Sequence, residues 1–237
     1  MVEFDTEVVD VIEMTYNVKS FRFRAGDDAV FRPGQFFFVT IKAEDRDMTK
    51  HFSFSNSPTE KGYVEFTKRI TGSPFSKALD GLKRGDWAHL RMPYGNFTFE
   101  GGHDRIAFLS GGIGVTPIRS MCKYAGDMKL ERDIVLLYGN SEERDIIFRR
   151  DLDEISSKIK NIRVLYTLTS QDVDNSTWAG RIGYIDSKMV REEIPDYNKR
   201  IFYICGPPNM VEGLKNILRD DLGVKEGSIK YENFSGY

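Results

Sequence analysis

The chain has 237 residues, of which 40% are hydrophobic and 30% charged, with 34 basic and 36 acidic side chains. This composition is typical of globular proteins and allows two modest domains. The near-neutral balance argues against a nucleic-acid-binding surface, and no apolar run reaches the roughly 18 residues that span a bilayer. Because the N-terminus also lacks the features of a signal peptide, we expect a cytoplasmic location without membrane insertion.

Metal ligands are scarce in this chain. Two cysteines cannot supply the four thiolates of an iron-sulfur cluster, and three scattered histidines do not make up the deficit. We therefore expect no metal site. The two cysteines are Cys122 and Cys205, and the three histidines are His51, His89 and His103.

Up to about residue 100, short runs of β-forming residues alternate with turn sequences, and one helical pattern lies near residues 75–82. This spacing predicts a small antiparallel β-barrel. A glycine-rich stretch at 100–104 is the expected linker to the next domain. The expected strands are residues 20–24, 36–41, 50–58, 63–69, 87–91 and 96–99.

After the linker, apolar β-rich runs alternate with segments of helical periodicity. This alternation predicts an α/β domain with a parallel sheet covered by helices. The expected strands are 105–109, 133–138, 162–166 and 200–204, and the clearest helical patterns are 148–159 and 209–219.

A glycine-rich turn follows the first of these strands, at residues 109–117. Its glycines would allow backbone amides to approach a phosphate, and we expect Thr116 to cap the following helix and Pro117 to be its first residue. Because Pro117 stands where the strict dinucleotide fingerprint has a third glycine, the loop fits a purely structural turn equally well.

A second motif, at residues 205–210, begins with Cys205 at the end of the strand 201–204. Ligands of open α/β sheets bind outside the carboxyl ends of the strands, so this motif and the glycine-rich turn are expected at the same edge. The alternative is that Cys205 is a small buried hydrophobic residue and the prolines only start the next helix.

Three motifs occur in a characteristic order: Lys-His-Phe-Ser-x-x-Asn-Ser-Pro at 50–58, Gly-Gly-x-Gly-x-Thr-Pro at 111–117 and Cys-Gly-Pro-Pro-x-Met at 205–210. The chain thereby resembles the ferredoxin-NADP reductase superfamily over nearly its whole length. The resemblance implies a Greek-key β-barrel for FAD at residues 1–100 and a Rossmann-like NAD(P) domain at 104–237. It also implies hydride transfer from NADPH or NADH to FAD.

In this resemblance, Phe52 matches the tyrosine that packs on the isoalloxazine and Ser53 the serine near flavin N5. Lys50 replaces the arginine that pairs with the FAD pyrophosphate, which keeps the charge but loses the bidentate fork. In a regular strand Phe52 and Ser53 point to opposite faces, so both reach one flavin only if the strand bends or ends there.

The segment 71–79 resembles the family's second flavin element, where amides near Phe75 and the Ser76 hydroxyl would bind phosphate. At the C-terminus, Phe234 matches the ring that covers the flavin, with Tyr237 as the alternative. The other expected FAD-binding residues are His51, Phe66, Thr67, Lys68, Gly72 and Ser73.

For the nicotinamide, the resemblance places Cys205 and Glu232 in the pocket, and together with Ser53 these are the expected catalytic residues. Near the adenosine ribose, Ser141 and Arg144 suit a 2′-phosphate, whereas Glu142 would repel it, so the donor stays open. The other expected nucleotide-binding residues are Gly112, Gly114, Thr116, Gly206, Pro207 and Met210.

The resemblance implies a reductase that passes electrons to ferredoxin or another one-electron carrier. With two cysteines, the iron-sulfur partner is expected to be a separate protein. Three alternatives remain: a free-flavin reductase, an electron-transfer subunit of a larger complex, and a non-catalytic binding module. The complex subunits usually carry extra cysteines near the C-terminus, which this chain lacks, and the oligomeric state is not predicted.

Overall fold

The computed structural model describes residues 1–43, 46–99, 103–170, 172–174 and 176–234. They divide into two compact units, Met1–Phe99 with Thr116–Tyr124, and Glu100–Val115 with Ala125–Tyr237. The segment 116–124 of the first unit is part of a helix that follows the glycine-rich turn. The expected linker 100–104 falls partly outside the described residues.

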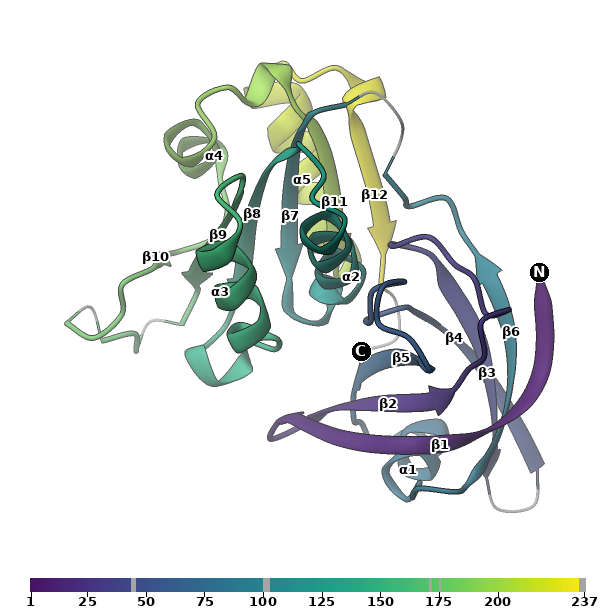
Figure 1. Cartoon of the computed structure of the whole chain (residues 1–237). Helices are drawn as coiled ribbons and strands as arrows, with labels where there is room; N and C mark the ends of the chain where they lie inside the picture. Colours follow the sequence, from purple (N-terminus) through teal and green to yellow (C-terminus); the bar gives the residue numbers. More distant parts are fainter. Residues whose placement is uncertain (44–45, 100–102, 171, 175, 235–237) are drawn as a thin grey trace. The chain divides into compact units, whose positions relative to one another are not determined.

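The first unit is built on a six-stranded antiparallel sheet with the order β4-β3-β6-β1-β2-β5 (Figure 1). Directly after β4 ends, the Ser55 amide donates to Glu65 O on β5 at 2.8 Å, so the two edges of the curled sheet meet there. The elements are β1 (Val2–Thr15), β2 (Val18–Arg24), β3 (Phe36–Ala43), β4 (Arg46–Ser53), β5 (Tyr63–Arg69), α1 (Pro74–Asp80) and β6 (Trp87–Tyr94).

Phenylalanine rings fill the core of this unit. Phe37 stacks on Phe54 with centroids 4.4 Å apart, and Phe66 stacks on both Phe21 and Phe23 at 5.2 and 5.8 Å. All five side chains are fully buried. The unusually high phenylalanine content therefore stabilises the barrel from within.

The second unit is a parallel sheet with the order β10-β9-β8-β7-β11-β12. Figure 1 shows α3 in front of the sheet and α5 behind it. The strands are β7 (Arg105–Gly111), β8 (Asp133–Asn140), β9 (Ile162–Leu168), β10 (Arg181–Ile182), β11 (Ile201–Gly206) and β12 (Ile229–Asn233), and the α-helices are α3 (Arg149–Lys158), α4 (Ser187–Glu193) and α5 (Pro208–Asn216). Helix α2 (Val115–Asp127) follows β7, and its residues 116–124 are grouped with the first unit.

These sheets confirm the predicted fold class, an antiparallel FAD-type barrel and a Rossmann-like parallel sheet. Some elements differ from the prediction. β1 and β12 were not predicted, and residues 96–99, predicted as a strand, form a loop after Gly95, whose φ of +90° starts a turn. Helix α2 begins at Val115, directly after a 3-10 turn at Gly112–Gly114, so Thr116 lies inside the helix and does not cap it.

Candidate functional site

The chain order of the second unit creates a switch point at the carboxyl edge of its sheet. From β7 the chain goes to β8 and β9 on one side, and it later returns to β11 on the other side of β7. Ligands of open α/β sheets bind outside the strand ends at such a switch. The turn Gly112–Gly114 follows β7, and Cys205 lies at the end of β11, so both predicted nucleotide motifs lie at this edge.

Two glycines of the turn serve different purposes. Gly112 has a φ of +53° and open space where a Cβ would lie, which leaves its backbone accessible. At Gly114, an added Cβ would lie 2.3 Å from the Cys205 carbonyl oxygen and 2.6 Å from Gly206 Cα. Gly114 is therefore needed for close packing between the turn and β11.

Replacing Gly114 with alanine is expected to lower the free energy of unfolding by about 1–3 kcal/mol, because rigid backbone atoms cannot yield to the new methyl group. Gly213 on α5 is the control, since its Cβ position is open. The Gly213→Ala variant should gain about 0.5–1 kcal/mol. Urea unfolding followed by tryptophan fluorescence measures both changes, and an unchanged midpoint for Gly114→Ala would contradict the packing argument.

Cys205 and Glu232 are neighbours across the β11–β12 pairing. The Cys205 side chain is fully buried, and the Glu232 Oε2 atom is buried without a hydrogen-bond partner among the described residues. Burial raises the pKa of Glu232 to about 7, and burial together with the Glu232 charge raises the pKa of the Cys205 thiol. This edge thus holds a neutral thiol beside a carboxyl group that titrates near neutral pH.

An unpaired buried oxygen is a site for a ligand donor, because leaving it unpaired is unfavourable. The carboxamide of a nicotinamide supplies such a donor, so Glu232 and Cys205 fit the pocket predicted for them. Phe234 lies two residues after Glu232, and its amide donates to Gly206 O at 2.9 Å. Tyr237, the alternative flavin-covering residue, lies outside the described residues.

The other predicted nucleotide residues differ in exposure. Met210 packs at the turn, since a Cβ on Gly111 would lie 2.3 Å from its sulfur atom. Thr116 and Gly206 are buried, whereas Pro207, Ser141 and Arg144 are exposed. Arg144 pairs with Glu142, with Nε 2.8 Å from Oε2.

The predicted flavin motif lies on β4 of the first unit. Phe52 stacks on Phe66, with centroids 4.1 Å apart and planes 9° from parallel. His51 is on the opposite face, tilted against Phe36 at 5.3 Å. β4 ends at Ser53, which is buried, so the strand ending anticipated for Phe52 and Ser53 is present.

The side chains of two predicted FAD residues on β5 pack against or hydrogen-bond with neighbours within the unit. Phe66 has no exposed surface and supports Phe52, and the Thr67 hydroxyl is hydrogen-bonded with those of Ser20 and Ser55 at 2.6 and 2.9 Å. The side chains of Phe66 and Thr67 therefore position their neighbours in this structure, and neither presents a free group.

Lys50 and Lys68 form a positively charged pair near this motif. Burial and the neighbouring Lys50 charge both lower the pKa of Lys68. Lys68 Nζ donates to the Arg69 carbonyl oxygen at 2.8 Å, and Lys50 is exposed. Two positive charges that act on one another attract an anion, so these lysines fit a pyrophosphate.

The second predicted flavin element is the start of α1. Ser73 caps the helix by accepting the Ser76 amide at 3.3 Å, and Ser76 Oγ accepts from Thr71 at 3.1 Å. Phe75 is buried with its ring 5.8 Å from Phe52, and Gly72 is exposed. The Ser76 amide is thus engaged in the capping of the helix, whereas the Ser76 hydroxyl oxygen accepts from Thr71.

The sequence did not predict a buried ion pair that supports the flavin motif. Arg119 on α2 is grouped with the first unit, and it donates to Ser55 O at 3.2 Å and to both carboxylate oxygens of Glu60 at 2.5 and 3.2 Å. Its neighbour Ser120 donates to Asn56 O at 2.6 Å. A signal was available, since an arginine in the apolar stretch after the glycine-rich turn needs a buried partner.

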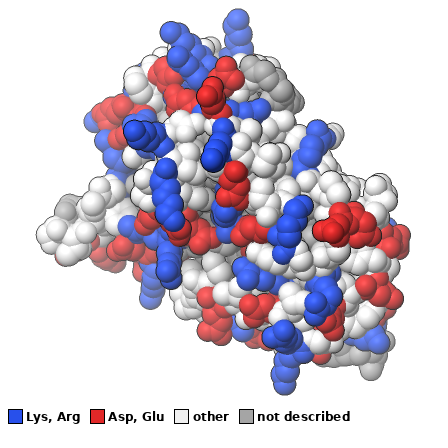
Figure 2. Space-filling view, in the orientation of Figure 1, with Lys and Arg blue, Asp and Glu red and all other residues white. Residues whose placement is uncertain are grey.

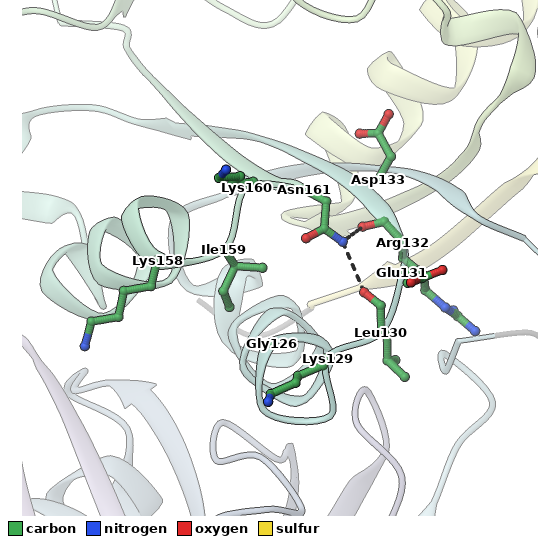
Figure 3. Close-up of a pocket in the computed structure, with 10 residues that line it drawn as sticks. All are labelled: Gly126, Lys129, Leu130, Glu131, Arg132, Asp133, Lys158, Ile159, Lys160 and Asn161. Atoms are coloured by element: carbon green, nitrogen blue, oxygen red, sulfur yellow. Dashed lines mark hydrogen bonds between the residues drawn. The ribbon is translucent and has the colours of Figure 1, made fainter.

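One surface hollow of the second unit lies away from these motifs. It encloses about 620 Å³ at the amino ends of the strands and is lined by residues of 126–133 and 158–161 (Figure 3). None of the predicted site residues lines it. Within the described part of the chain, no cluster of metal-ligand side chains was found, and no helix has the length and hydropathy to cross a bilayer.

Comparison with known proteins defines the class of the two units. Residues 5–99 match the oxidoreductase FAD-binding domain and residues 108–216 the oxidoreductase NAD-binding domain. The chain has the fold of a ferredoxin NADP+ reductase from Neisseria gonorrhoeae with bound FAD and NADP, with a TM-score of 0.84 at 18% identity over 98% of each chain. The chain therefore carries a flavin domain and a nicotinamide-nucleotide domain.

Three named relatives are reductases or reductase components of oxygenase systems. The glycine betaine monooxygenase reductase subunit of Pseudomonas aeruginosa is 31% identical over 216 residues, 89% of this chain and 59% of the relative. The propane 2-monooxygenase reductase component of Rhodococcus jostii is 28% identical, covering 97% of this chain and 63% of the relative. The ferredoxin reductase in carbazole 1,9a-dioxygenase is 26% identical, with a TM-score of 0.80 over 98% of this chain and 69% of the other.

The chain thus joins an oxidoreductase FAD-binding domain to an oxidoreductase NAD-binding domain, and these matches support the resemblance to the ferredoxin-NADP reductase superfamily that its three motifs indicated. It spans about 60% of the length of the two curated relatives.

Proposed function

We propose that this chain is a reductase that transfers hydride from a nicotinamide dinucleotide to FAD and passes the electrons to a separate acceptor. The observation that carries the proposal is the buried, unpaired Glu232 Oε2 beside Cys205, at the switch point that follows the glycine-rich turn. The relatives named above are reductase components of oxygenase systems, which supports an electron carrier or an oxygenase as the acceptor.

When bound, FAD supplies a ring that accepts a hydride and releases electrons singly. On the protein side, Lys50 and Lys68 would hold the pyrophosphate by charge, and Phe52, supported by Phe66, would hold the ring. The Ser53 hydroxyl would donate a hydrogen bond to flavin N5. At the other cofactor, Glu232 would accept from the nicotinamide carboxamide, and the neutral Cys205 would fill the pocket.

We expect NADH to be the preferred donor. The Glu142 carboxylate is fixed by a reciprocal cap with Asp145, and it holds Arg144 by an ion pair. A 2′-phosphate near this loop would meet three acidic side chains, Glu142, Glu143 and Asp145, and would compete with Glu142 for Arg144. A free ribose diol would instead find carboxylate acceptors.

Positive and negative side chains are interspersed over the visible face (Figure 2). This view therefore favours no particular docking surface for the acceptor. The predicted ferredoxin partner remains a proposal drawn from the family.

An anaerobic visible spectrum of the purified chain, reconstituted with FAD, tests this function. The flavin absorbance should bleach on addition of NADH, with a kcat/KM at least tenfold above that for NADPH, and should recover when a one-electron acceptor such as ferricyanide is added. A chain that retains no FAD and oxidises neither nucleotide would overturn the proposal. FAD that separates on gel filtration while NADH oxidation continues with added FAD would identify a free-flavin reductase instead.

A further inference from the structure

Asn140 is the last residue of β8, at the carboxyl edge of the parallel sheet. Its side chain is 6% exposed, and neither its amide nitrogen nor its amide oxygen has a hydrogen-bond partner among the described residues. Its backbone oxygen is satisfied by the Thr169 amide at 3.0 Å. The unpaired groups thus belong to the side chain alone.

A buried carboxamide with no partner is unfavourable, because its donor and its acceptor have both lost water without replacement. The chain satisfies a comparable amide at the opposite edge of the same sheet. Asn161 Nδ2 donates to Leu130 O at 3.1 Å and to Arg132 O at 2.6 Å (Figure 3). Asn140 therefore stands out as a group kept for a ligand.

The position of Asn140 along the edge indicates which ligand. The strand order places Glu232 on β12 and Cys205 on β11 at one end, the turn after β7 next, and Asn140 on β8 beyond it. Three strand spacings of about 4.8 Å place β8 roughly 14 Å from β12. Two residues earlier on the same face of β8, the Tyr138 hydroxyl donates to Gly112 O of the turn at 2.9 Å, so Asn140 lies on the side that carries the turn.

We propose that the Asn140 carboxamide binds the adenosine half of the nicotinamide dinucleotide. The inference rests on the proposed function, since it requires the nicotinamide at Glu232 and the pyrophosphate at the turn Gly112–Gly114. A carboxamide offers one acceptor and two donors, which match a ribose diol or the polar edge of an adenine. Binding would satisfy the two groups that the unliganded chain leaves unpaired.

The test uses Asn140→Leu in the full chain, because leucine has a similar size and removes both polar atoms. The variant should melt about 2–4 °C higher than the wild type, since an unsatisfied group is lost. Its Kd for ADP-ribose should rise about tenfold, corresponding to about 1.4 kcal/mol. Its Kd for nicotinamide mononucleotide should stay within twofold of the wild type. Calorimetric titration measures both affinities.

Asn161→Leu is the matched control. It should melt lower, because two carbonyl acceptors lose their donor, and both affinities should be unchanged. An Asn140→Leu variant that melts lower and binds ADP-ribose like the wild type would overturn the assignment, and NADH-dependent flavin bleaching in the wild type would then leave the proposed function intact. A wild type that binds neither fragment and shows no bleaching would overturn both.

Discussion

Replacing Arg119 with methionine is expected to lower the free energy of unfolding by about 3–5 kcal/mol. Arg119 is 6% exposed, and its guanidinium binds both oxygens of Glu60 and the Ser55 carbonyl. Burial alone would raise the pKa of Glu60, but the hydrogen bonds and charge of Arg119 outweigh it and hold the pKa below its ordinary value. The methionine variant therefore leaves a buried carboxylate without its cation.

Denaturant unfolding of two further variants tests this argument. The double variant Glu60→Gln with Arg119→Met should recover at least about 1 kcal/mol, because the uncompensated charge is removed. Arg24→Met breaks the exposed ion pair with Glu7 and should change stability by less than about 1 kcal/mol. Equal losses for Arg119→Met and Arg24→Met would contradict the importance of burial.

Replacing Glu232 with glutamine is expected to change how stability depends on pH. Burial raises the pKa of this carboxyl from 4.5 to about 7 in the folded chain. Between these values the folded state holds a proton that the unfolded state has released, so this group makes the wild type less stable as pH rises from about 4.5 to 7. The loss amounts to about 3 kcal/mol and stays constant at higher pH.

The measurement is the difference in free energy of unfolding between Glu232→Gln and the wild type, from pH 4 to pH 8. Glutamine cannot ionise, so the variant should gain on the wild type through this window by about 3 kcal/mol. Other titrating groups cancel in the difference. A difference that does not vary with pH would show that Glu232 is not held protonated in the folded chain.

The missed and mistaken strands show where local patterns mislead. β1 begins with Glu3, Asp5 and Glu7 at alternate positions and continues into a mostly apolar run at 8–12, so its strand pattern was present in the sequence and was missed. β12 is an edge strand of five residues with only Ile229 buried. The aromatic residues at 96–99 suit a strand, but Gly95 turns the chain, and the Phe97 backbone packs where a Cβ on Gly34 would lie.

Short-range sequence patterns explain which predictions were confirmed. β-runs separated by turns identified the barrel, and β-runs alternating with helical segments identified the parallel sheet. The three motifs indicated the family. All of these signals act between residues close in sequence. They also placed Cys205 and the turn Gly112–Gly114 at one edge, since the carboxyl ends of parallel strands lie together.

The sequence by itself thus determined the class of each unit and the motifs that its cofactors require. The tertiary structure decided the partners: Arg119 with Glu60, 59 residues away, Cys205 beside Glu232 through strand register, and Asn140 with none among the described residues. Burial and pairing depend on which distant strands become neighbours, and no local pattern encodes that. The desolvation that shifts the pKa of Glu232 and leaves Asn140 unpaired arises when those strands assemble.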